Sequence, residues 1–189
     1  ISEGQTSGTR TFSSTEDNIY EGNETATLTI SGIGGGDASP AVENGNQQAV
    51  VTIVDDESAP TVTLSTSASS IAENSDGTIT VTATMSAADT ADVTVAIGTS
   101  GTGTEGTDYG TISDITISAG NTTGTSTFDP TDDSVYEGNE TAIIAITGVS
   151  GGSASENGTQ SETITITEND SAPTVTLSTS ASSINENSG

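Results

Sequence analysis

Carboxylates are the only abundant side chains in this sequence that could carry out chemistry. The 189 residues include 27 Asp and Glu but a single basic residue, Arg10, and neither His nor Cys. The sequence therefore offers no imidazole or thiolate for a zinc or copper site, and no histidine base or thiol nucleophile. Carboxylate oxygens suit a hard cation, and calcium takes about six to eight oxygen ligands in flexible geometry. Calcium binding is the chemistry that these residue types favour.

The charge balance and the aromatic content exclude several functions. With a formal net charge of −26, the chain has nothing that could neutralise the phosphates of a nucleic acid or attract it to an anionic membrane. No apolar run approaches the roughly 20 residues of a membrane-spanning helix. Paired carboxylates can hydrolyse glycosides, but three Tyr, two Phe and no Trp would stack poorly on a sugar. We expect neither an enzyme, nor nucleic-acid binding, nor direct membrane insertion.

The sequence repeats itself. Residues 59–71, APTVTLSTSASSI, recur unchanged at 172–184, and residues 20–26, YEGNETA, recur at 136–142. The two spacings differ because one loop is longer in the first copy, where Asp37 to Val42 face only Ser153 to Ser155. Self-similarity at a fixed period is the signature of a tandem array, so we expect the chain to be cut from a longer one.

These identities divide the chain into three parts. Residues 1–57 correspond to the second half of one repeat, residues 58–170 to a complete repeat, and residues 171–189 to the start of the next. Neighbouring repeats would follow one another head to tail, because the end of each leads directly into the first strand of the following one.

The complete repeat shows the alternation of β-strands. Ile, Val, Leu and Phe make up less than a fifth of the chain, which is typical of disorder, but they alternate with Thr, as in Thr61-Val62-Thr63-Leu64. We therefore predict an all-β fold with a thin core. Seven short strands in a repeat of this length suggest a seven-stranded immunoglobulin-like sandwich. The predicted strands cover about 61–66, 77–85, 92–98, 112–117, 123–129, 140–147 and 161–167.

If these strands run up and down, the acids gather at one pole of the sandwich. The connections after the first, third and fifth strands meet there, together with the end of the seventh strand. The opposite pole carries only Asp89, Asp92 and Glu156. The acids of the crowded pole would repel one another strongly without a cation among them. They are Glu73, Glu105, Asp108, Asp132, Asp133, Glu137, Glu140, Glu168 and Asp170.

The same segregation recurs in the partial repeats. A single Asp or Glu in a loop is usually a solvated charge, but a cluster kept in two copies favours a cation site. In the first copy Glu16 stands where the complete repeat has Asp132. The candidate ligands in the partial repeats are Asp17, Glu21, Glu24, Asp55, Asp56 and Glu57 in the first copy, and Glu186 in the last.

Four motifs in this order resemble the Calx-beta domain. They are IAEN from Ile71, GTDY ending at Tyr109, DDSVYEGNE from Asp132, and ITITEND ending at Asp170. The resemblance extends over the complete repeat and both partial ones, and it implies an immunoglobulin-like sandwich that binds calcium at one pole. The ligands that it implies are Glu73, Asp108, Asp132, Asp133, Glu137 and Glu140, a carbonyl from Val135, and a closing acidic run at Glu168 and Asp170.

The closing acidic run departs from the family pattern. Calcium-sensing members end the last strand on consecutive aspartates, whereas this repeat has Glu168-Asn169-Asp170 and the preceding copy has Asp55-Asp56-Glu57. The number of ions at each junction is left open by this difference.

Together these features predict a calcium-binding structural repeat of a long extracellular or cell-surface protein, bacterial by the resemblance. Calcium at the junctions would stiffen a stalk or filament segment that spaces or supports adhesion. The expected partners are calcium ions, adjacent repeats of the same chain and, if the array forms a fibre, other copies. Two alternatives stay open: an adhesive module that binds sugar or protein through its loops, and a regulatory calcium sensor. We also expect Tyr20 and Tyr136 to fill the corner between the fifth and sixth strands.

Overall fold

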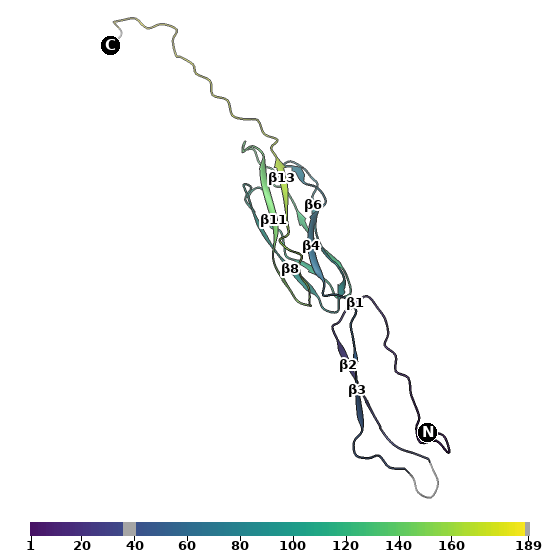
Figure 1. The fold of residues 1–189 in the computed structure, drawn as a ribbon. Helices are drawn as coiled ribbons and strands as arrows, with labels where there is room; N and C mark the ends of the chain where they lie inside the picture. Colours follow the sequence, from purple (N-terminus) through teal and green to yellow (C-terminus); the bar gives the residue numbers. More distant parts are fainter. Residues whose placement is uncertain (36–40, 188–189) are drawn as a thin grey trace.

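The protein is an all-β chain of three parts placed end to end (Figure 1). The computed structural model describes residues 1–35 and 41–187, so the longer loop of the first copy, predicted to begin at Asp37, lies partly outside the described residues. None of the described segments forms a helix that could span a membrane. The predicted fold class is confirmed.

Residues 58–170 form a sandwich of two sheets. One sheet has the strand order β10-β6-β4-β12, and the other has the order β5-β13-β11-β8-β9. The strands are β4 (Thr61–Thr66), β5 (Ser70–Ala72), β6 (Ile79–Met85), β7 (Ala88–Asp89), β8 (Val93–Gly101), β9 (Ile115–Ile117), β10 (Thr123–Phe128), β11 (Glu140–Ser150), β12 (Ser155–Glu156) and β13 (Ser161–Thr167). The seven predicted strands correspond to β4, β6, β8, β9, β10, β11 and β13.

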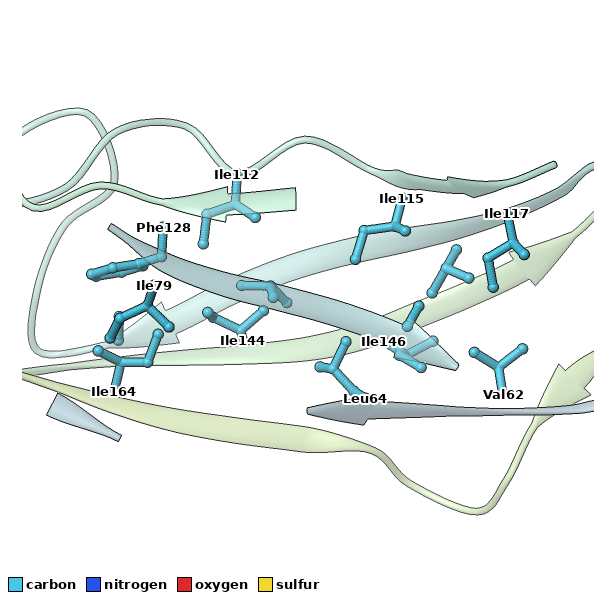
Figure 2. Packing of buried hydrophobic residues seen from close by; sticks show 14 of the residues in the cluster. Val62, Leu64, Ile79, Ile112, Ile115, Ile117, Phe128, Ile144, Ile146 and Ile164 are labelled. Atoms are coloured by element: carbon cyan, nitrogen blue, oxygen red, sulfur yellow. The ribbon is translucent and has the colours of Figure 1, made fainter. Parts of the chain in front are cut away.

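The core lies between the two sheets, and strand alternation produces it. Along β6, Ile79, Val81, Ala83 and Met85 are buried while the Thr residues between them face outward. Ile144 of β11 meets this layer from the other sheet with no exposed surface (Figure 2). Most core side chains are Val, Ile or Ala, so the core is continuous but contains few large side chains.

Four short strands, β1 (Ile19–Tyr20), β5, β7 and β12, were not predicted from the sequence. β5 continues the first strand after a crossing to the other sheet, where it pairs in parallel with β13. β12 pairs in parallel with β4, and β7 pairs with β1 of the preceding copy. These strands are two or three residues long, too short for alternation to be recognised. They exist because a partner edge lies beside them.

In the partial repeats, segments that are buried or paired in the complete repeat are exposed. In the first copy, β2 (Glu24–Thr29) and β3 (Gln48–Ile53) form a hairpin whose apolar face is largely exposed. In the last copy, residues 174–179 have the same sequence as β4 but do not form a strand, and Val175 and Leu177 are 98% and 97% exposed. An identical sequence thus becomes a strand only where β6 pairs with it.

Candidate metal centre

The acidic pole is built on a hydrogen-bonded framework between the β10–β11 connection (residues 129–139) and the end of β13. The backbone N–H groups of Glu137 and Gly138 donate to Glu168 Oε2 at 2.6 and 2.9 Å. In return, the Glu168 N–H donates to Asn139 Oδ1 at 3.0 Å. Gly138 has a φ of 81°, a conformation that favours glycine, and this allows the chain to turn beneath the carboxylate.

One group of three carboxylates joins three separate segments. Glu73 follows β5, Asp133 lies in the β10–β11 connection and Asp170 follows β13, and each offers one oxygen within 4.8 Å of the other two. Glu73 is only 8% exposed and accepts a long hydrogen bond, 3.4 Å, from the Asp133 N–H. In the part of the chain that the structure describes, Asp170 Oδ2 is the one buried side-chain atom without a hydrogen-bond partner. An orphaned, buried, negatively charged oxygen fits a cation ligand.

A second group is made by Asp108, Glu137 and Glu140, again with oxygens within 4.8 Å of one another. Asp108 is buried in the β8–β9 connection (residues 102–114), where its Oδ2 accepts a hydrogen bond of 2.6 Å from the Thr104 N–H. The two groups contain six carboxylates drawn from four segments that are distant in sequence. All six were among the predicted ligands.

Four carboxylates at this pole have raised pKa values. Burial, and next the negative charge of Asp108, raise the pKa of Glu140 to about 7. Burial is also the main cause that raises the pKa of Glu73, of Glu137 and of Asp170, and neighbouring carboxylates add to it. A group that holds its proton near neutrality would lose it to a bound cation, because an ion stabilises the carboxylate form.

The pKa of Glu168 shifts in the opposite direction. Backbone N–H groups, first that of Asp170 and then that of Glu137, lower its pKa to about 2. Both Glu168 oxygens accept such bonds, because the Asp170 N–H donates to Oε1 at 2.8 Å. Glu168 was predicted as a ligand, yet it lies outside both groups of three and acts as the organiser of the loop.

Two further predicted ligands lie at the edge of the pole. Asp132 is exposed and accepts a hydrogen bond of 3.3 Å from Asn169 Nδ2. Val135 donates its N–H to Asp133 Oδ1 at 2.6 Å while its side chain is 59% exposed. Glu105, a member of the predicted acidic pole, accepts hydrogen bonds from the Thr99 hydroxyl and the Ile112 N–H and holds the β8–β9 connection together.

The first copy repeats the framework with a different acidic group. The N–H groups of Glu21 and Gly22 donate to Asp55 Oδ2, and the Asp55 N–H donates to Asn23 Oδ1 at 3.1 Å. Desolvation opposes the effect, but these backbone hydrogen bonds lower the pKa of Asp55, and repulsion from Asp17 raises that of Glu21.

The carboxylates that meet in the first copy are Glu16, Asp56 and Glu57, with oxygens within 4.8 Å. In the complete repeat, Asp132 and Asn169 occupy the places of Glu16 and Asp56, and the amide hydrogen bond stands where two acids meet in the first copy. Four predicted ligands lie outside this group, namely Asp17, Glu21, Glu24 and Asp55, and Glu186 is exposed in the C-terminal segment.

The two tyrosines that were expected to fill the corner between the fifth and sixth strands differ in burial. Tyr136 is 47% exposed, so it does not fill the corner between β10 and β11, and Tyr20 is half-buried. Tyr109, 1% exposed, closes that end of the core instead and stacks on Phe128 with ring centroids 4.9 Å apart. The prediction was wrong for Tyr136, since the buried tyrosine at this end of the core is Tyr109.

Sequence reasoning also missed several residues that shape the poles. Asn139 and Asn23 accept the hydrogen bonds that start the acidic run, and their recurrence in both copies of YEGNETA was the available signal. At the opposite pole Asp89 is buried, 3% exposed, which the sequence did not indicate.

Comparison with known proteins identifies the family. The Calx-beta domain matches residues 2–57 and again residues 55–170. The chain belongs to the Calx-beta domain family. The two matches follow one another along the chain, as expected for Calx-beta repeats.

Sixteen chains of solved structures also match. One is the crystal structure of the apo-form Calx CBD1 domain, 20% identical, with a TM-score of 0.47 over 59% of this chain and 99% of that one. Another is that of CBD12 from CALX1.2, 21% identical, with a TM-score of 0.45 over 53% of this chain and 41% of that one. No curated protein matches the chain.

Proposed function

We propose that each Calx-beta repeat of this chain binds calcium at its acidic pole and that the ions stiffen a head-to-tail array outside the cell. The observation that carries the proposal is the convergence of Glu73, Asp133 and Asp170 from three segments, with Asp170 Oδ2 buried and unpaired. The group formed by Asp108, Glu137 and Glu140 lies at the same pole.

The donor set favours calcium over other cations. All six side chains are carboxylates, hard oxygen donors, and the chain has no His or Cys to select zinc or copper. Magnesium retains more of its water and uses fewer protein ligands, whereas calcium accepts many oxygens in irregular geometry. A bound cation would supply the positive charge that lets the six carboxylates ionise side by side.

Ion binding would connect four segments at the acidic pole. Glu73 follows β5, Asp108 lies between β8 and β9, Glu137 lies between β10 and β11, and Asp170 follows β13. Hydrogen bonds already link these segments, and an ion would add a common ligand where their carboxylates now repel one another. A ligand that binds only the folded state stabilises it, and calcium at about ten times its Kd would contribute roughly 1.4 kcal/mol per site.

The position of the pole connects binding to a mechanical role. Asp170 is followed at once by Ser171-Ala172-Pro173 and the next copy of the repeat, so a bound ion would restrict bending where repeats meet. Each repeat adds roughly the length of β11, eleven residues or about 37 Å at 3.4 Å per residue. A stalk or filament of such units would space an adhesive element away from a cell surface, in keeping with the bacterial surface location that the sequence suggests.

Calcium titration of the full chain by calorimetry tests the proposal. We expect saturable binding with a Kd of about 10⁻⁴ to 10⁻³ M, the range of extracellular calcium modules. Asp133→Asn and Glu140→Gln should each weaken binding about tenfold or more, since each removes a charged ligand. Asp76→Asn is the matched control, because Asp76 is an exposed acid between β5 and β6 that belongs to neither group.

The titration separates the proposal from its alternatives. No heat of binding at millimolar calcium would contradict it and leave the adhesive module as the better hypothesis. Binding with a Kd below about 10⁻⁶ M would fit a regulatory sensor inside a cell and contradict the extracellular stalk.

A further inference from the structure

The first copy and the complete repeat meet through a short piece of sheet. β1 (Ile19–Tyr20), in the loop before β2, pairs in parallel with β7 (Ala88–Asp89), with Ile19 opposite Ala88 and Tyr20 opposite Asp89. Figure 1 places β1 at the end of the sandwich that is opposite to the acidic pole of the complete repeat. The acidic-pole loop of one repeat therefore contacts the non-acidic pole of the next.

Asp89 fixes the conformation of β7. Its Oδ2 accepts a hydrogen bond of 2.7 Å from the Ser153 N–H, its Oδ1 accepts one of 3.0 Å from the Ala91 N–H, and its carbonyl accepts one of 2.9 Å from the Gly120 N–H. These donors come from three different connections of the non-acidic pole. A Cβ on Gly152 would stand 2.6 Å from Asp89 Oδ2, so the backbone closes tightly around the carboxylate. We call residues 86–92, held in this way, the knob.

The complete repeat carries a second copy of the edge that the knob contacts. Val135 and Tyr136 occupy the places of Ile19 and Tyr20 before the two copies of EGNETA. Their backbone is shaped in the same way, since Val135 donates to Asp133 Oδ1 at 2.6 Å and Ile19 donates to Asp17 Oδ1 at 2.8 Å. Ile19 and Tyr20 are half-buried, whereas the side chains of Val135 and Tyr136 are 59% and 47% exposed.

The linkers at the two junctions are the same. Residues 58–60 and residues 171–173 are both Ser-Ala-Pro, and both follow an acidic run at the end of the last strand. At the first junction Pro60 is buried and its carbonyl accepts a hydrogen bond of 3.0 Å from Ser155 at the non-acidic pole. The sequence that follows residue 173 repeats β4 without change. Because the linker has the same length and the first strand is identical, the next copy would lie as close to the acidic pole of the complete repeat as the complete repeat lies to that of the first copy.

We propose that Val135 and Tyr136 form a docking edge for the knob of the following repeat, with Asp89 as the positioning residue of each knob. Every repeat then carries a preformed knob at one pole and a matching edge at the other, and the array has one defined geometry at each junction. The contact is a backbone pairing beside which the side chains of Ile19 and Tyr20 are half-buried.

Cysteine pairs test the contact directly, because the natural chain contains no Cys. In the full chain, Ile19→Cys with Ala88→Cys should form an intramolecular disulfide about tenfold faster than the control pair Thr29→Cys with Ala88→Cys, because paired strand positions lie within disulfide range. Thr29 is exposed at the far end of β2. Loss of thiol reactivity with time gives both rates, and equal rates would overturn the contact on which the inference rests.

A tandem chain tests the second edge. Residues 1–170 followed by another copy of residues 58–170 would place a knob beyond Val135. We expect Val135→Cys to pair with a cysteine at the Ala88 position of that added copy about as fast as Ile19→Cys pairs with Ala88→Cys, because the register is the same. A rate no higher than that of the control pair would overturn the proposal. Thermal unfolding of both oxidised chains checks that the bonds form in folded protein.

Discussion

The hairpin of β2 and β3 and the hairpin of β11 and β13 are two copies of one structure with different amounts of support. Their registers agree, since Glu24 pairs with Ile53 as Glu140 pairs with Ile166. Their burial does not: Leu28 is 39% exposed, whereas Ile144 in the same place of the complete repeat is fully buried. Pairing register and loop hydrogen bonds therefore follow from local sequence, and the core follows only from the facing sheet.

The acidic pole has two parts that depend on different amounts of the chain: the hydrogen-bonded loop framework and the groups of candidate ligands. The framework around Glu168 or Asp55 is formed within one hairpin and its loop, so it is present in both copies. The groups of three around Asp108 and Glu73 require connections from the first half of a repeat, and among the described residues they occur in the complete repeat, where that half is present. Local sequence positions the loop, and the complete sandwich assembles the candidate ligands.

The largest difference between the two hairpins should appear when their cores are truncated. Ile144→Ala removes a fully buried side chain and should lower the free energy of unfolding of the complete repeat by about 2–5 kcal/mol. Leu28→Ala, the matched change, should cost less than about 1 kcal/mol because much of Leu28 already contacts water. Urea denaturation of the full chain measures both. Equal losses would contradict the view that only one hairpin has a core.

A second comparison contrasts two acids of the non-acidic pole. Asp89→Asn leaves one of the two part-buried N–H groups that bind its carboxylate facing an amide NH₂ group, and it should lower the free energy of unfolding by about 1–3 kcal/mol. Asp92→Asn is the control, because Asp92 is exposed and its carboxylate accepts the Ala119 N–H. Its expected cost is less than about 1 kcal/mol. Hydrogen exchange at Ser153 should quicken in the first variant alone, and unchanged exchange there would count against the positioning role.

The acidic pole should make the metal-free protein less stable as pH rises. Folding raises the pKa of Glu140 from 4.5 to about 7, so the folded state binds more protons in that interval. The resulting stability is fully present below pH 4.5 and is lost as pH rises through about 7. Since Glu140 is only partly buried, solvent screening reduces the expected loss to about 1 kcal/mol.

Denaturation midpoints in metal-free buffer on either side of this interval measure the effect. Glu140→Gln cannot titrate and should flatten the profile. A profile equally steep in Glu140→Gln would assign the pH dependence to another group.

The smallest expected effect concerns the difference between the two acidic runs. Asn169→Asp removes the hydrogen bond to Asp132 and recreates the pair of acids found at Glu16 and Asp56 in the first copy. Repulsion should cost a few tenths of a kcal/mol without metal, and calcium binding should tighten because a ligand charge is added. The reverse change, Asp56→Asn, should have the opposite sign in both measurements. Calorimetric titrations of the two variants would show whether this one position sets the difference between junctions.

Much of the fold could be predicted from the sequence because its signals are local. The first and last predicted strands agree with β4 and β13 residue for residue, since alternation of Thr with Val, Leu or Ile marks both. The strand predicted at 112–117 is shorter in the structure, where β9 begins at Ile115 and Ile112 is buried in the preceding connection. From the sequence alone, a single apolar residue that is buried in a loop cannot be distinguished from a buried residue of a strand.

The candidate site was predictable only in part. The up-and-down order of strands places acids at one pole, but only three-dimensional packing decides which oxygens meet. Glu168 carries the same charge as Asp170, yet backbone N–H groups occupy both its oxygens while Asp170 Oδ2 stays unpaired. Asp89 is a comparable case, since its partner Ser153 lies 64 residues away. Contacts of this kind carry no local signature.

Thermal unfolding of the full chain, with millimolar calcium and with excess chelator, tests the central proposal most directly. If calcium joins the four segments of the acidic pole, the melting temperature should rise by roughly 5–10 °C in calcium, as expected for a few kcal/mol in a domain of this size. The rise should disappear in the double variant Asp133→Asn, Glu140→Gln and persist in Asp76→Asn. Identical melting of the natural chain in both conditions would contradict calcium binding and leave the acids as surface charge.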